Sequence, residues 1–462
     1  MEAKSIHFVG IGGVGTGTLA VNLAQRGFKV TGSDGALYEP MKSVLTNARI
    51  ELIQGYDAAT ASRIAADAVI IGNVITKANS EARAWIQKGT PFYSFPEAVR
   101  RFVIESRKNV VVAGTHGKTT TSTWIAYLLS ELGLNPSYLI GGVPNDLPSG
   151  SAITDGLYAV CEGDEYDSAF FDKGPKFLHY HPHFLVLTSI EFDHADIYRD
   201  LDHVKQSFEK LVALLPGDGL CVARYDDPVV VEVAAESLCP VQSFGNNPSA
   251  MWRLNDVKET PEGFDFEVLY KKRSIGRFQT PLYGEHNLFN LISGIICAVN
   301  LGAPVQKIAP IVSRFTGVRR RQQVLQASPF YLIDDFAHHP TEVLATLSAV
   351  RRRHPTGKLF ALFEPRSATA RRSVHQEVYP KAFAPADEIC VSIPIRQSEL
   401  GSDSRFSADT LADDLKKAGK SARAFENADA IATFVRAEVK PGDVVVVMSN
   451  GEFGKIQRRL VS

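Results

Sequence analysis

The sequence has few cysteines, no long apolar run and no excess of charge, and each shortage excludes a class of protein. Its five cysteines lie far apart in 462 residues and include no Cys-x-x-Cys pair, so neither a disulfide framework nor a cysteine zinc cluster is expected. No apolar run approaches the roughly 20 residues that span a bilayer. With 50 basic against 51 acidic residues, neither a nucleic-acid backbone nor an anionic membrane is the expected partner.

What is present is an ordinary globular composition. The chain has 45% hydrophobic and 22% charged residues, which excludes wholesale disorder. Its N-terminus leads into a strand without the pattern of a secretory signal peptide. These features together predict a soluble protein of the cytoplasm.

The first motif is a glycine-rich turn between a strand expected at residues 6–9 and a helix expected at 18–25. Glycines let backbone N–H groups approach a pyrophosphate, and the helix N-terminus adds partial positive charge. A strand at 29–31 then ends in an acidic residue about 20 positions past the glycines, the spacing of a dinucleotide site, and a strand at 68–71 ends at the same edge. The candidate binding residues are Gly10, Gly12, Gly13, Gly15, Asp34 and Asn73. The motif fits NAD as well as any other nucleotide diphosphate, and a turn without a ligand remains the alternative.

A second glycine-rich loop carries a stronger signal. An unbroken β-branched run at 110–112 predicts a buried parallel strand, and an amphipathic helix follows the loop. In such a phosphate loop the backbone N–H groups and the helix dipole hold the phosphates, Lys118 neutralises the β- and γ-oxygens, and the Thr119 hydroxyl ligates Mg²⁺. The loop residues are Gly114, Thr115, His116, Gly117, Lys118, Thr119 and Thr120. The loop is shorter than G-x-x-x-x-G-K-[ST], but its strand and helix flanks favour a phosphate site over a plain turn.

Two later strands of this unit end in acidic clusters. A strand at 157–160 leads into Glu162–Glu165, and one at 184–190 leads into Glu191–His194. Because the carboxyl ends of parallel strands line the ligand crevice, both clusters should face the phosphate loop. Glu162 and His194 are the predicted Mg²⁺ ligands, and helix capping or solvation is the alternative for the other carboxylates.

Two further polar sets have competing explanations. His179, His181 and His183 alternate as zinc ligands on a strand would, but no cysteine lies nearby and His-Pro-His breaks pairing, so a surface or substrate-lining role is favoured. Asn287 and Asn290 lie one turn apart at the start of a helix. Their amides could face one planar ring such as adenine, and helix capping is the alternative.

The last third of the chain alternates strands and helices without a second phosphate loop. Strands are expected at 330–333, 358–363, 388–393 and 443–448, each followed by a polar loop. These loops carry Asp335, His338, Arg366, Ser449, Asn450 and Gly451. The preceding Arg319–Arg321 run lies at a domain junction and fits a phosphate clamp, with a solvated charge run as the alternative.

The length and the pattern together predict the architecture. At about 150 residues per domain, the chain should form roughly three domains. An α/β fold is expected, with a Rossmann-like N-terminal domain at residues 1–107 and a central phosphate-loop domain with a mostly parallel sheet at 108–313. A Rossmann-like C-terminal domain is expected at 314–462.

Taken together, the motifs resemble those of the Mur ligase family, ATP-dependent enzymes that join amino acids or peptides to UDP-N-acetylmuramate. The resemblance extends over essentially the whole chain, and the coordinated set is specific where no single motif is. The motifs are Gly10–Gly15, Gly114–Thr120, Glu162 with His194, Gly284–Asn290 and Asp334–Thr341. The resemblance implies a carbon–nitrogen ligase of cell-wall synthesis that uses ATP and Mg²⁺, with two ions.

Within the family, several segments are similar to members that attach the tripeptide L-alanyl-γ-D-glutamyl-meso-diaminopimelate to UDP-N-acetylmuramate in murein recycling. These segments are Gly32–Asp34, Asp164–Lys173, Glu191–Asp196, Glu364–Ser367 and Met448–Gly451. The glycine turn at 10–15 reads more like members that add L-alanine in de novo peptidoglycan synthesis, which remains the alternative. The third peptide residue, diaminopimelate or lysine, and the tolerance for longer peptides stay open.

The resemblance also implies a mechanism and site roles. The muramyl lactate carboxylate would attack the γ-phosphate of ATP to give an acyl phosphate and ADP, and the peptide amine would then displace phosphate. Lys118 and Thr119 would serve the phosphates and the first Mg²⁺, while Glu162 would bridge two ions and His194 would bind the second. For ATP, the resemblance assigns Asn287 and Asn290 to adenine, Asp335 to the ribose and Arg321 to the γ-phosphate. It places His338 near the reaction centre and assigns the peptide to Arg366, Ser449, Asn450 and Gly451. Some relatives carry a carbamylated lysine, and the candidates for it here are Lys205 and Lys210.

Two other classes of function compete with a ligase. A dehydrogenase would rest on the first glycine motif alone and would leave Lys118 and Thr119 unexplained. A non-catalytic nucleotide sensor would not need paired metal ligands at two strand ends. The expected partners are therefore small-molecule substrates, with neither nucleic acid nor membrane, and the expected assembly is a monomer or a weak dimer.

Overall fold

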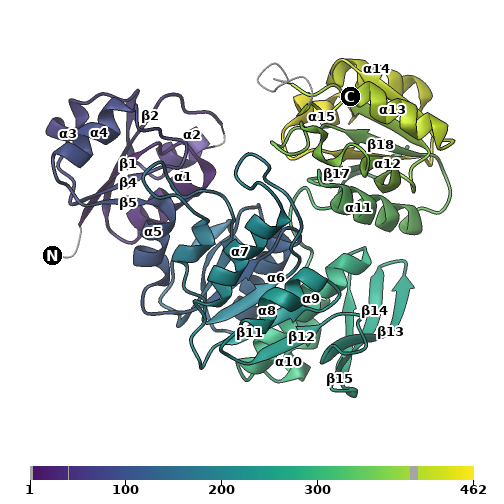
Figure 1. Cartoon of the computed structure of the whole chain (residues 1–462), viewed down its shortest axis with the longest axis horizontal. Coiled ribbons are helices and arrows are strands. Elements are labelled where there is room, and N and C mark those ends of the chain that lie inside the picture. The colour runs from purple at the N-terminus through teal and green to yellow at the C-terminus, as the bar shows by residue number, and fades with distance from the viewer. Residues whose placement is uncertain (1–3, 40, 396–403, 462) are drawn as a thin grey trace.

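The chain folds into three α/β domains, each built around its own sheet (Figure 1). The computed structural model describes residues 4–39, 41–395 and 404–461. Helices cover the sheets, and strands such as β4 (Ala68–Ile71), β10 (Phe184–Leu187), β18 (Leu359–Phe363) and β21 (Val444–Met448) are completely buried apolar runs. The predicted three-domain α/β fold is confirmed.

The N-terminal domain has a five-stranded parallel sheet in the order β3-β2-β1-β4-β5. Its strands are β1 Ser5–Val9, β2 Lys29–Asp34, β3 Glu51–Gln54, β4 Ala68–Ile71 and β5 Phe92–Ser94. Its helices are α1 Val14–Gln25, α2 Met41–Asn47, α3 Thr60–Arg63, α4 Ser80–Gln87 and α5 Phe95–Val99. Helix α1 begins four residues before the expected start, because Gly13 already serves as its extended N-cap.

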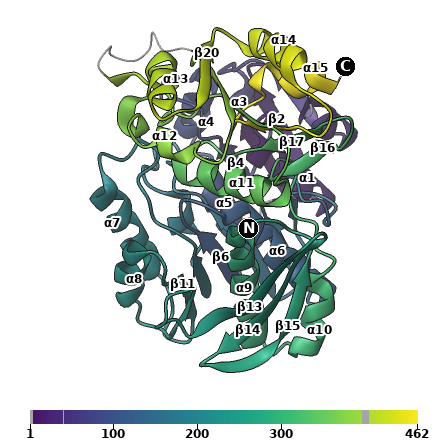
Figure 2. The ribbon, with the colours of Figure 1, turned by 90° about the vertical axis from the view of Figure 1, so that its right-hand side faces the viewer.

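The central domain has a ten-stranded sheet in the order β15-β14-β13-β12-β11-β10-β6-β9-β7-β8. Its strands are β6 Lys108–Ala113, β7 Ser137–Leu139, β8 Ser151–Ala152, β9 Tyr158–Gly163, β10 Phe184–Leu187, β11 Leu220–Arg224, β12 Val241–Phe244, β13 Trp252–Thr260, β14 Gly263–Tyr270 and β15 Arg273–Thr280. Its helices are α6 Lys118–Glu131, α7 Leu201–Val212, α8 Pro228–Ala235, α9 Glu285–Asn300 and α10 Val305–Val312. Strands β13–β15 form antiparallel hairpins that extend away from the other two domains (Figures 1 and 2), a feature that the sequence did not predict.

The C-terminal domain has a six-stranded sheet in the order β16-β17-β21-β18-β19-β20, in which only β16 runs antiparallel to its neighbour. Its strands are β16 Gln323–Gln326, β17 Tyr331–Asp335, β18 Leu359–Phe363, β19 Glu388–Ser392, β20 Ser421–Phe425 and β21 Val444–Met448. Its helices are α11 Pro340–Arg353, α12 Tyr379–Ala382, α13 Ala408–Lys417, α14 Ala428–Glu438 and α15 Ile456–Val461.

The segment that follows β9 fastens the N-terminal domain to the central one. The Ser94 hydroxyl donates to Asp172 Oδ2 at 2.7 Å, and the rings of Phe92 and Phe171 meet edge to face at 5.1 Å. On the other side, Asn22 Nδ2 donates to the Ser151 hydroxyl at 2.6 Å. The two domains therefore share both polar and apolar contacts.

Two further features concern the cysteines and the hydrophobicity of the helices. All five cysteine side chains are buried free thiols. Among the described helices, none combines the length and the hydrophobicity that crossing a bilayer requires.

Helix α6 follows the phosphate loop and packs against α9, and one glycine sets how closely they approach. Buried Trp124 on α6 donates its indole N–H to the Leu291 carbonyl at 2.9 Å. A Cβ at Gly294 would lie only 2.3 Å from that indole nitrogen. This contact fixes α9, and with it Asn287 and Asn290, relative to the loop.

We therefore expect Gly294→Ala to destabilise the protein by about 1–3 kcal/mol, because the added methyl must displace the indole. In an unconstrained helix the same change would stabilise by about 1 kcal/mol. The shift of the urea unfolding midpoint measures the effect. A variant more stable than the wild type would contradict this packing.

Candidate active site

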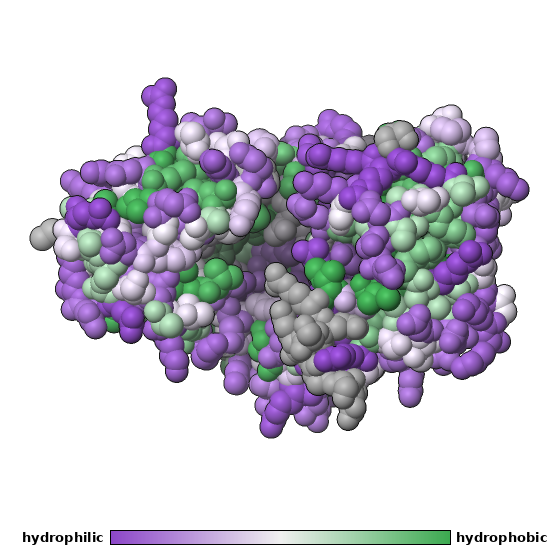
Figure 3. Space-filling model, turned by 90° about the horizontal axis from the view of Figure 1, so that it is seen from above, coloured by the Kyte–Doolittle hydropathy of each residue, from purple (hydrophilic) through white to green (hydrophobic). Residues whose placement is uncertain are grey.

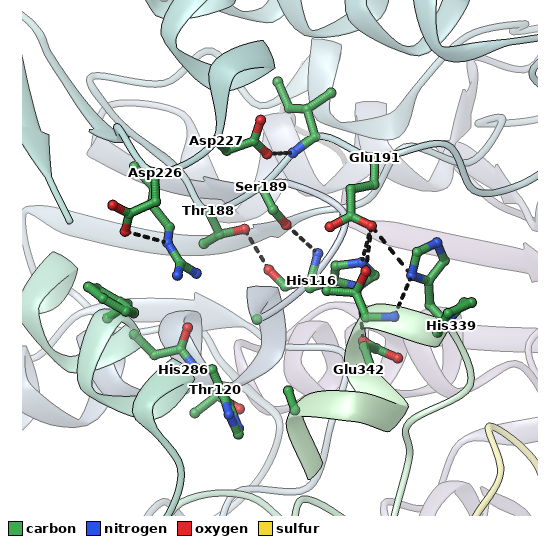
Figure 4. Close-up of a pocket in the computed structure, with 18 of the residues that line it drawn as sticks. His116, Thr120, Thr188, Ser189, Glu191, Asp226, Asp227, His286, His339 and Glu342 are labelled. Atoms are coloured by element: carbon green, nitrogen blue, oxygen red, sulfur yellow. Dashed lines mark hydrogen bonds and ion pairs between the residues drawn. The ribbon is translucent and has the colours of Figure 1, made fainter. Parts of the chain in front are cut away.

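A cavity of about 690 Å³ lies where the central domain meets the C-terminal domain. The phosphate loop, the loop after β10 and the start of α9 form one side, and the start of α11 forms the other (Figure 4). From above, the surface is hollowed between the two outer domains (Figure 3). The cavity is large enough for a small-molecule substrate or cofactor.

The phosphate loop leaves room for an anion because two positions can only be glycine. Gly114 has φ +140°, and a Cβ there would lie 2.1 Å from the Thr188 hydroxyl. Gly117 has φ +80° and is the left-handed N-cap of α6, and a Cβ there would lie 2.7 Å from Asn290 Oδ1. No side chain caps α6, so the first N–H groups of the helix are left for a phosphate.

Lys118 is held at the base of this loop by a carboxylate. Its ammonium donates to the Gly114 carbonyl at 2.6 Å and lies 3.0 Å from Glu165 Oε2. Burial alone would lower the pKa of Lys118, but Glu165 and Asp164 outweigh it and raise that pKa above its ordinary value. The cation is thus fixed and charged before any phosphate arrives.

The predicted metal ligands gather beside Lys118. The Thr119 hydroxyl donates to Glu162 Oε1 at 2.8 Å, and the Gly141 N–H donates to the other Glu162 oxygen at 2.7 Å. His194 Nε2 lies 2.9 Å from Glu165 Oε1, so Glu165 joins His194 to Lys118. A hydroxyl, carboxylates and an imidazole at the mouth of a phosphate loop are a donor set that fits Mg²⁺.

The two asparagines of α9 line the cavity but bond to each other and to the protein. Asn290 Nδ2 donates to Asn287 Oδ1 at 3.1 Å, and Asn290 Oδ1 accepts from the Thr121 hydroxyl at 3.2 Å. Asn287 Nδ2 donates to the Tyr283 carbonyl at 2.7 Å. Their amides are therefore organised as one network at the edge of the cavity, and their contact with an adenine stays a prediction.

Two titratable groups that line the cavity, partly buried His286 and buried Asp335, have shifted pKa values. Burial, together with the nearby charge of Arg224, lowers the pKa of His286 to about 4, so this imidazole is neutral at physiological pH. Burial raises the pKa of Asp335 to about 6, although the N–H groups of Gln322 and Ala337 donate to its carboxylate at 2.7 and 2.8 Å.

The side chain of His116 projects from the phosphate loop and connects the central domain to the C-terminal domain. Its Nδ1 lies 3.2 Å from Glu342 Oε1 on α11, and its Nε2 lies 3.6 Å from Glu191 Oε2 in the loop after β10 (Figure 4). Burial alone would lower the pKa of His116, but bonding to both carboxylates raises it to about 9. Glu191 Oε2 also accepts from the Thr341 hydroxyl at 2.7 Å.

Glu191 is shared with a second imidazole. His339 Nδ1 lies 3.5 Å from Glu191 Oε2, and burial together with the charge of His116 lowers the pKa of His339 to about 3. One ligand atom from each of His116, Glu191 and His339 lies within 4.8 Å of the others, a spacing that could also hold a metal ion. At neutral pH, however, the His116 imidazolium already balances the carboxylate charge.

The arginine run at 319–321 divides into different roles. Arg321 lines the cavity and lies over the Phe336 ring at 4.9 Å. Arg320 instead donates to the carbonyls of Ser449 and Gly451 at 2.6 and 2.7 Å, and so supports that loop. Arg319 is exposed, so Arg321 is the member of this run that lines the cavity, and its role as a phosphate clamp stays a prediction.

The predicted peptide-binding residues lie beside one another. A Cβ on Gly451 would lie 2.2 Å from the side chain of Arg366, and the Ser449 hydroxyl donates to buried Glu364 at 2.5 Å. Asn450 lies between Ser449 and Gly451 on the same loop. His338, predicted near the reaction centre, lies 3.8 Å from Asp193 Oδ2 across the domain boundary.

In the N-terminal glycine turn, the Asp34 carboxylate accepts a hydrogen bond from the turn backbone. Its Oδ2 accepts from the Gly12 N–H at 2.7 Å, and a Cβ on Gly12 would lie 2.9 Å from the same oxygen. Asn73 is exposed beyond the end of β4, next to this turn in the sheet order. Gly10 and Gly13 lie in the turn at the carboxyl end of β1, and Gly15 is the second residue of α1.

Other residues named from the sequence lie elsewhere. His179 belongs to a short 3-10 helix, Lys176–His179, and not to a strand, and its ring lies 2.9 Å from Asp172. The Lys205 ammonium pairs with Glu232 on α8, and Lys210 is exposed on α7.

The sequence reading missed three carboxylates of the site: Glu165, Glu191 and Glu342. Glu165 and Glu191 belong to the two acidic clusters that it identified, where position after a strand was the only available signal. Glu342 is the third residue of α11, a position at which a glutamate ordinarily caps a helix. Because helix capping explains a glutamate at this position, the sequence offered no reason to expect that Glu342 contacts the central domain.

Comparison with known proteins gives consistent matches along the chain. Three family profiles match, described as Mur ligase family, catalytic domain at residues 5–107, Mur ligase middle domain at 112–298, and Mur ligase, glutamate ligase domain at 319–451. The UDP-N-acetylmuramate–L-alanyl-γ-D-glutamyl-meso-2,6-diaminoheptandioate ligase of Escherichia coli K12 is 36% identical over 99% of this chain and 97% of its own. A UDP-N-acetylmuramate–L-alanine ligase of Desulfitobacterium hafniense is 30% identical over 99% of each chain.

Solved structures agree with these matches. A murein peptide ligase from Psychrobacter arcticus is 30% identical, with a TM-score of 0.73 over 99% of this chain and 98% of its own. A UDP-N-acetylmuramate–alanine ligase from Thermotoga maritima has a TM-score of 0.78 over 100% of this chain and 98% of its own. At 24% identity, that second likeness concerns the fold alone.

Proposed function

The chain belongs to the Mur ligase family of ATP-dependent acid–amino-acid ligases, and from this premise we propose that it joins L-alanyl-γ-D-glutamyl-meso-diaminopimelate to UDP-N-acetylmuramate in murein recycling. The observation that carries the proposal is the 36% identity, over nearly the full length of both chains, to the Escherichia coli enzyme named for this reaction. Ligases named for L-alanine are also similar, at 30% identity or below, so addition of L-alanine is the second candidate.

In this proposal each domain has one main task, and Arg321 and Asp335 add contacts with ATP from the C-terminal part of the chain. Residues up to 107 hold the UDP-sugar through the glycine turn and Asn73, residues 108–313 hold ATP, and residues from 314 onwards bring the peptide. The enzyme acts in the cytoplasm as a monomer or a weak dimer. The hollow between the outer domains then lies where the two polar substrates must meet.

The site residues would activate the sugar carboxylate by charge and position. Lys118 and the N–H groups of α6 hold the β- and γ-phosphates, and Arg321 approaches the γ-phosphate from the C-terminal side. Thr119, Glu162 and His194 would hold Mg²⁺ at two positions, which would further neutralise the phosphate oxygens. The lactate carboxylate oxygen bonds to the γ-phosphorus as the bond to ADP breaks.

The second step forms the amide. The peptide amine attacks the acyl carbon, the tetrahedral intermediate expels inorganic phosphate, and the nitrogen loses a proton. His338, between Glu342 and Asp193, lies close enough to the domain boundary to order this centre. Asn287, Asn290 and Asp335 hold the nucleoside, and Arg366 with the Ser449–Gly451 loop holds carboxylates of the peptide.

Phosphate release with ATP and UDP-N-acetylmuramate tests the choice of amine. We expect kcat/KM for the tripeptide to exceed that for L-alanine by about a hundredfold or more, because a site built for several carboxylates loses those contacts with a single amino acid. The kcat/KM for a matched tripeptide that ends in lysine shows whether the enzyme discriminates between diaminopimelate and lysine at the third residue. Preference for L-alanine would overturn the proposal in favour of the second candidate.

A further inference from the structure

We propose that Glu342 is a positioning residue that links the phosphate loop to two side chains of the C-terminal part of the chain, Arg321 and His338. The inference rests on the ligase function proposed above and adds a residue to it. Glu342 would not touch the substrates. It would act through the three side chains around it.

The contacts of Glu342 come from three separate parts of the chain. Oε1 lies 3.2 Å from His116 Nδ1 in the phosphate loop and 4.0 Å from Arg321 just before β16. Oε2 lies 3.3 Å from His338 Nδ1 and accepts from the His338 backbone N–H at 3.2 Å. One carboxylate therefore touches the central domain, the interdomain segment and the loop that begins the C-terminal site.

A charged carboxylate is needed at this position because it faces the cations of His116 and Arg321 and is largely shielded from water. Only 14% of the Glu342 side chain is exposed. Burial alone would raise the pKa of Glu342, but His116, His338 and Arg321 outweigh it and hold that pKa well below the usual range. A glutamine would keep the shape but remove the negative charge that faces His116, His338 and Arg321.

The partners of Glu342 suggest what its loss would do. Lys118, Gly117 and the first turn of α6 lie entirely within the central domain, so nucleotide binding should survive. Arg321 and His338 would lose their fixed position relative to the phosphate loop. A misplacement of about 1 Å can cost a hundredfold in rate, so the loss should fall on turnover and not on nucleotide affinity.

His116 gives this role a pH signature. The titratable groups that interact with it are Glu191, Glu342, His339 and His375, and the charged Arg321 lies 4.0 Å from the same Glu342 oxygen. Two carboxylates keep His116 protonated to about pH 9. Without the Glu342 charge, only Glu191 favours the cation, so His116 would lose its proton at lower pH.

The test compares Glu342→Gln with the wild type in the ligase assay. We expect kcat to fall about a hundredfold, the dissociation constant for a non-hydrolysable ATP analogue to change less than about threefold, and the alkaline limb of kcat to move down by about one pH unit or more. Glu342→Asp, which keeps the charge, should restore the alkaline limb. Asp409→Asn is the matched control, because Asp409 is an exposed first-turn carboxylate of α13 in the same domain.

Small-angle scattering adds a readout that needs no turnover. The ATP analogue should compact the wild type and leave Glu342→Gln more open. If the wild type fails to ligate yet compacts in a Glu342-dependent way, the proposed function fails and the positioning role stands. If Glu342→Gln does not fold, His116→Gln removes the other end of the same pair; it should change the scattering in the same way and abolish the alkaline limb that the titration of His116 produces. An unmoved alkaline limb, or equal losses in the Asp and Gln variants, would overturn the proposal.

Discussion

Lys118→Ala is expected to lower tripeptide-dependent phosphate release by about a thousandfold. In the proposed mechanism the Lys118 ammonium neutralises the β- and γ-oxygens, and Glu165 fixes this cation in place in the phosphate loop. Alanine would remove that charge from a buried site, where an electrostatic contact is worth far more than in water. ADP and phosphate production, measured at saturating ATP, gives the loss directly.

Lys108→Ala is the control for this variant. Lys108 begins β6, the strand that leads into the phosphate loop, but it lies exposed at the opposite end from Lys118. It should retain nearly full activity. Because removing Lys118 also leaves Glu165 without its partner, binding of UDP-N-acetylmuramate to the N-terminal domain should be measured to confirm that Lys118→Ala is folded. Unchanged ADP production would refute the assignment of the phosphate loop.

Glu162→Gln is the second variant with a large expected effect. Glu162 accepts from the Thr119 hydroxyl and from the Gly141 N–H, so both of its oxygens are aimed by the protein. Glutamine can accept only one of these bonds and carries no charge for a metal ion. We expect kcat to fall by about a hundredfold or more and the Mg²⁺ concentration for half-maximal rate to rise.

A Mg²⁺ titration separates this effect from a folding defect. Partial recovery of Glu162→Gln at high Mg²⁺ would indicate weakened metal binding, whereas Glu259→Gln, an exposed carboxylate on β13, should titrate like the wild type. A Mg²⁺ dependence identical to that of the wild type would contradict the role of Glu162 as a ligand.

The parts of the fold that were predictable are those whose signals are local. The β-branched run before Gly114 identified β6, and the glycines with Lys118 and Thr119 identified the loop, because strand, turn and helix follow one another in sequence. The hairpins β13–β15 carried no such signal. Their second turn places Lys271 and Lys272 at positive φ, 49° and 68°, where Asn-Gly would have marked a two-residue turn.

The parts of the site that were not predictable depend on contacts between distant segments. Thr119 and Glu162 were expected to meet because their strands end at one sheet edge, and they lie 2.8 Å apart. The pairing of His116 with Glu342 joins two domains, and no periodicity or spacing in the sequence encodes it. The role of Arg320 could not be predicted either, because Arg319 and Arg321 beside it are the same residue type. Only the structure shows that the Arg320 guanidinium binds the Ser449–Gly451 loop.

The buried thiols allow the distance between the outer domains to be measured with site-specific fluorophores. Burial raises the pKa of Cys161 and of Cys297 to about 12, so almost none of either is thiolate at neutral pH. Maleimide dyes and mild oxidants should therefore leave these side chains alone in the folded protein. Two cysteines introduced on the surfaces of the outer domains would take up fluorophores first. The distance between those fluorophores would report each opening and closing of the cleft during a single catalytic cycle.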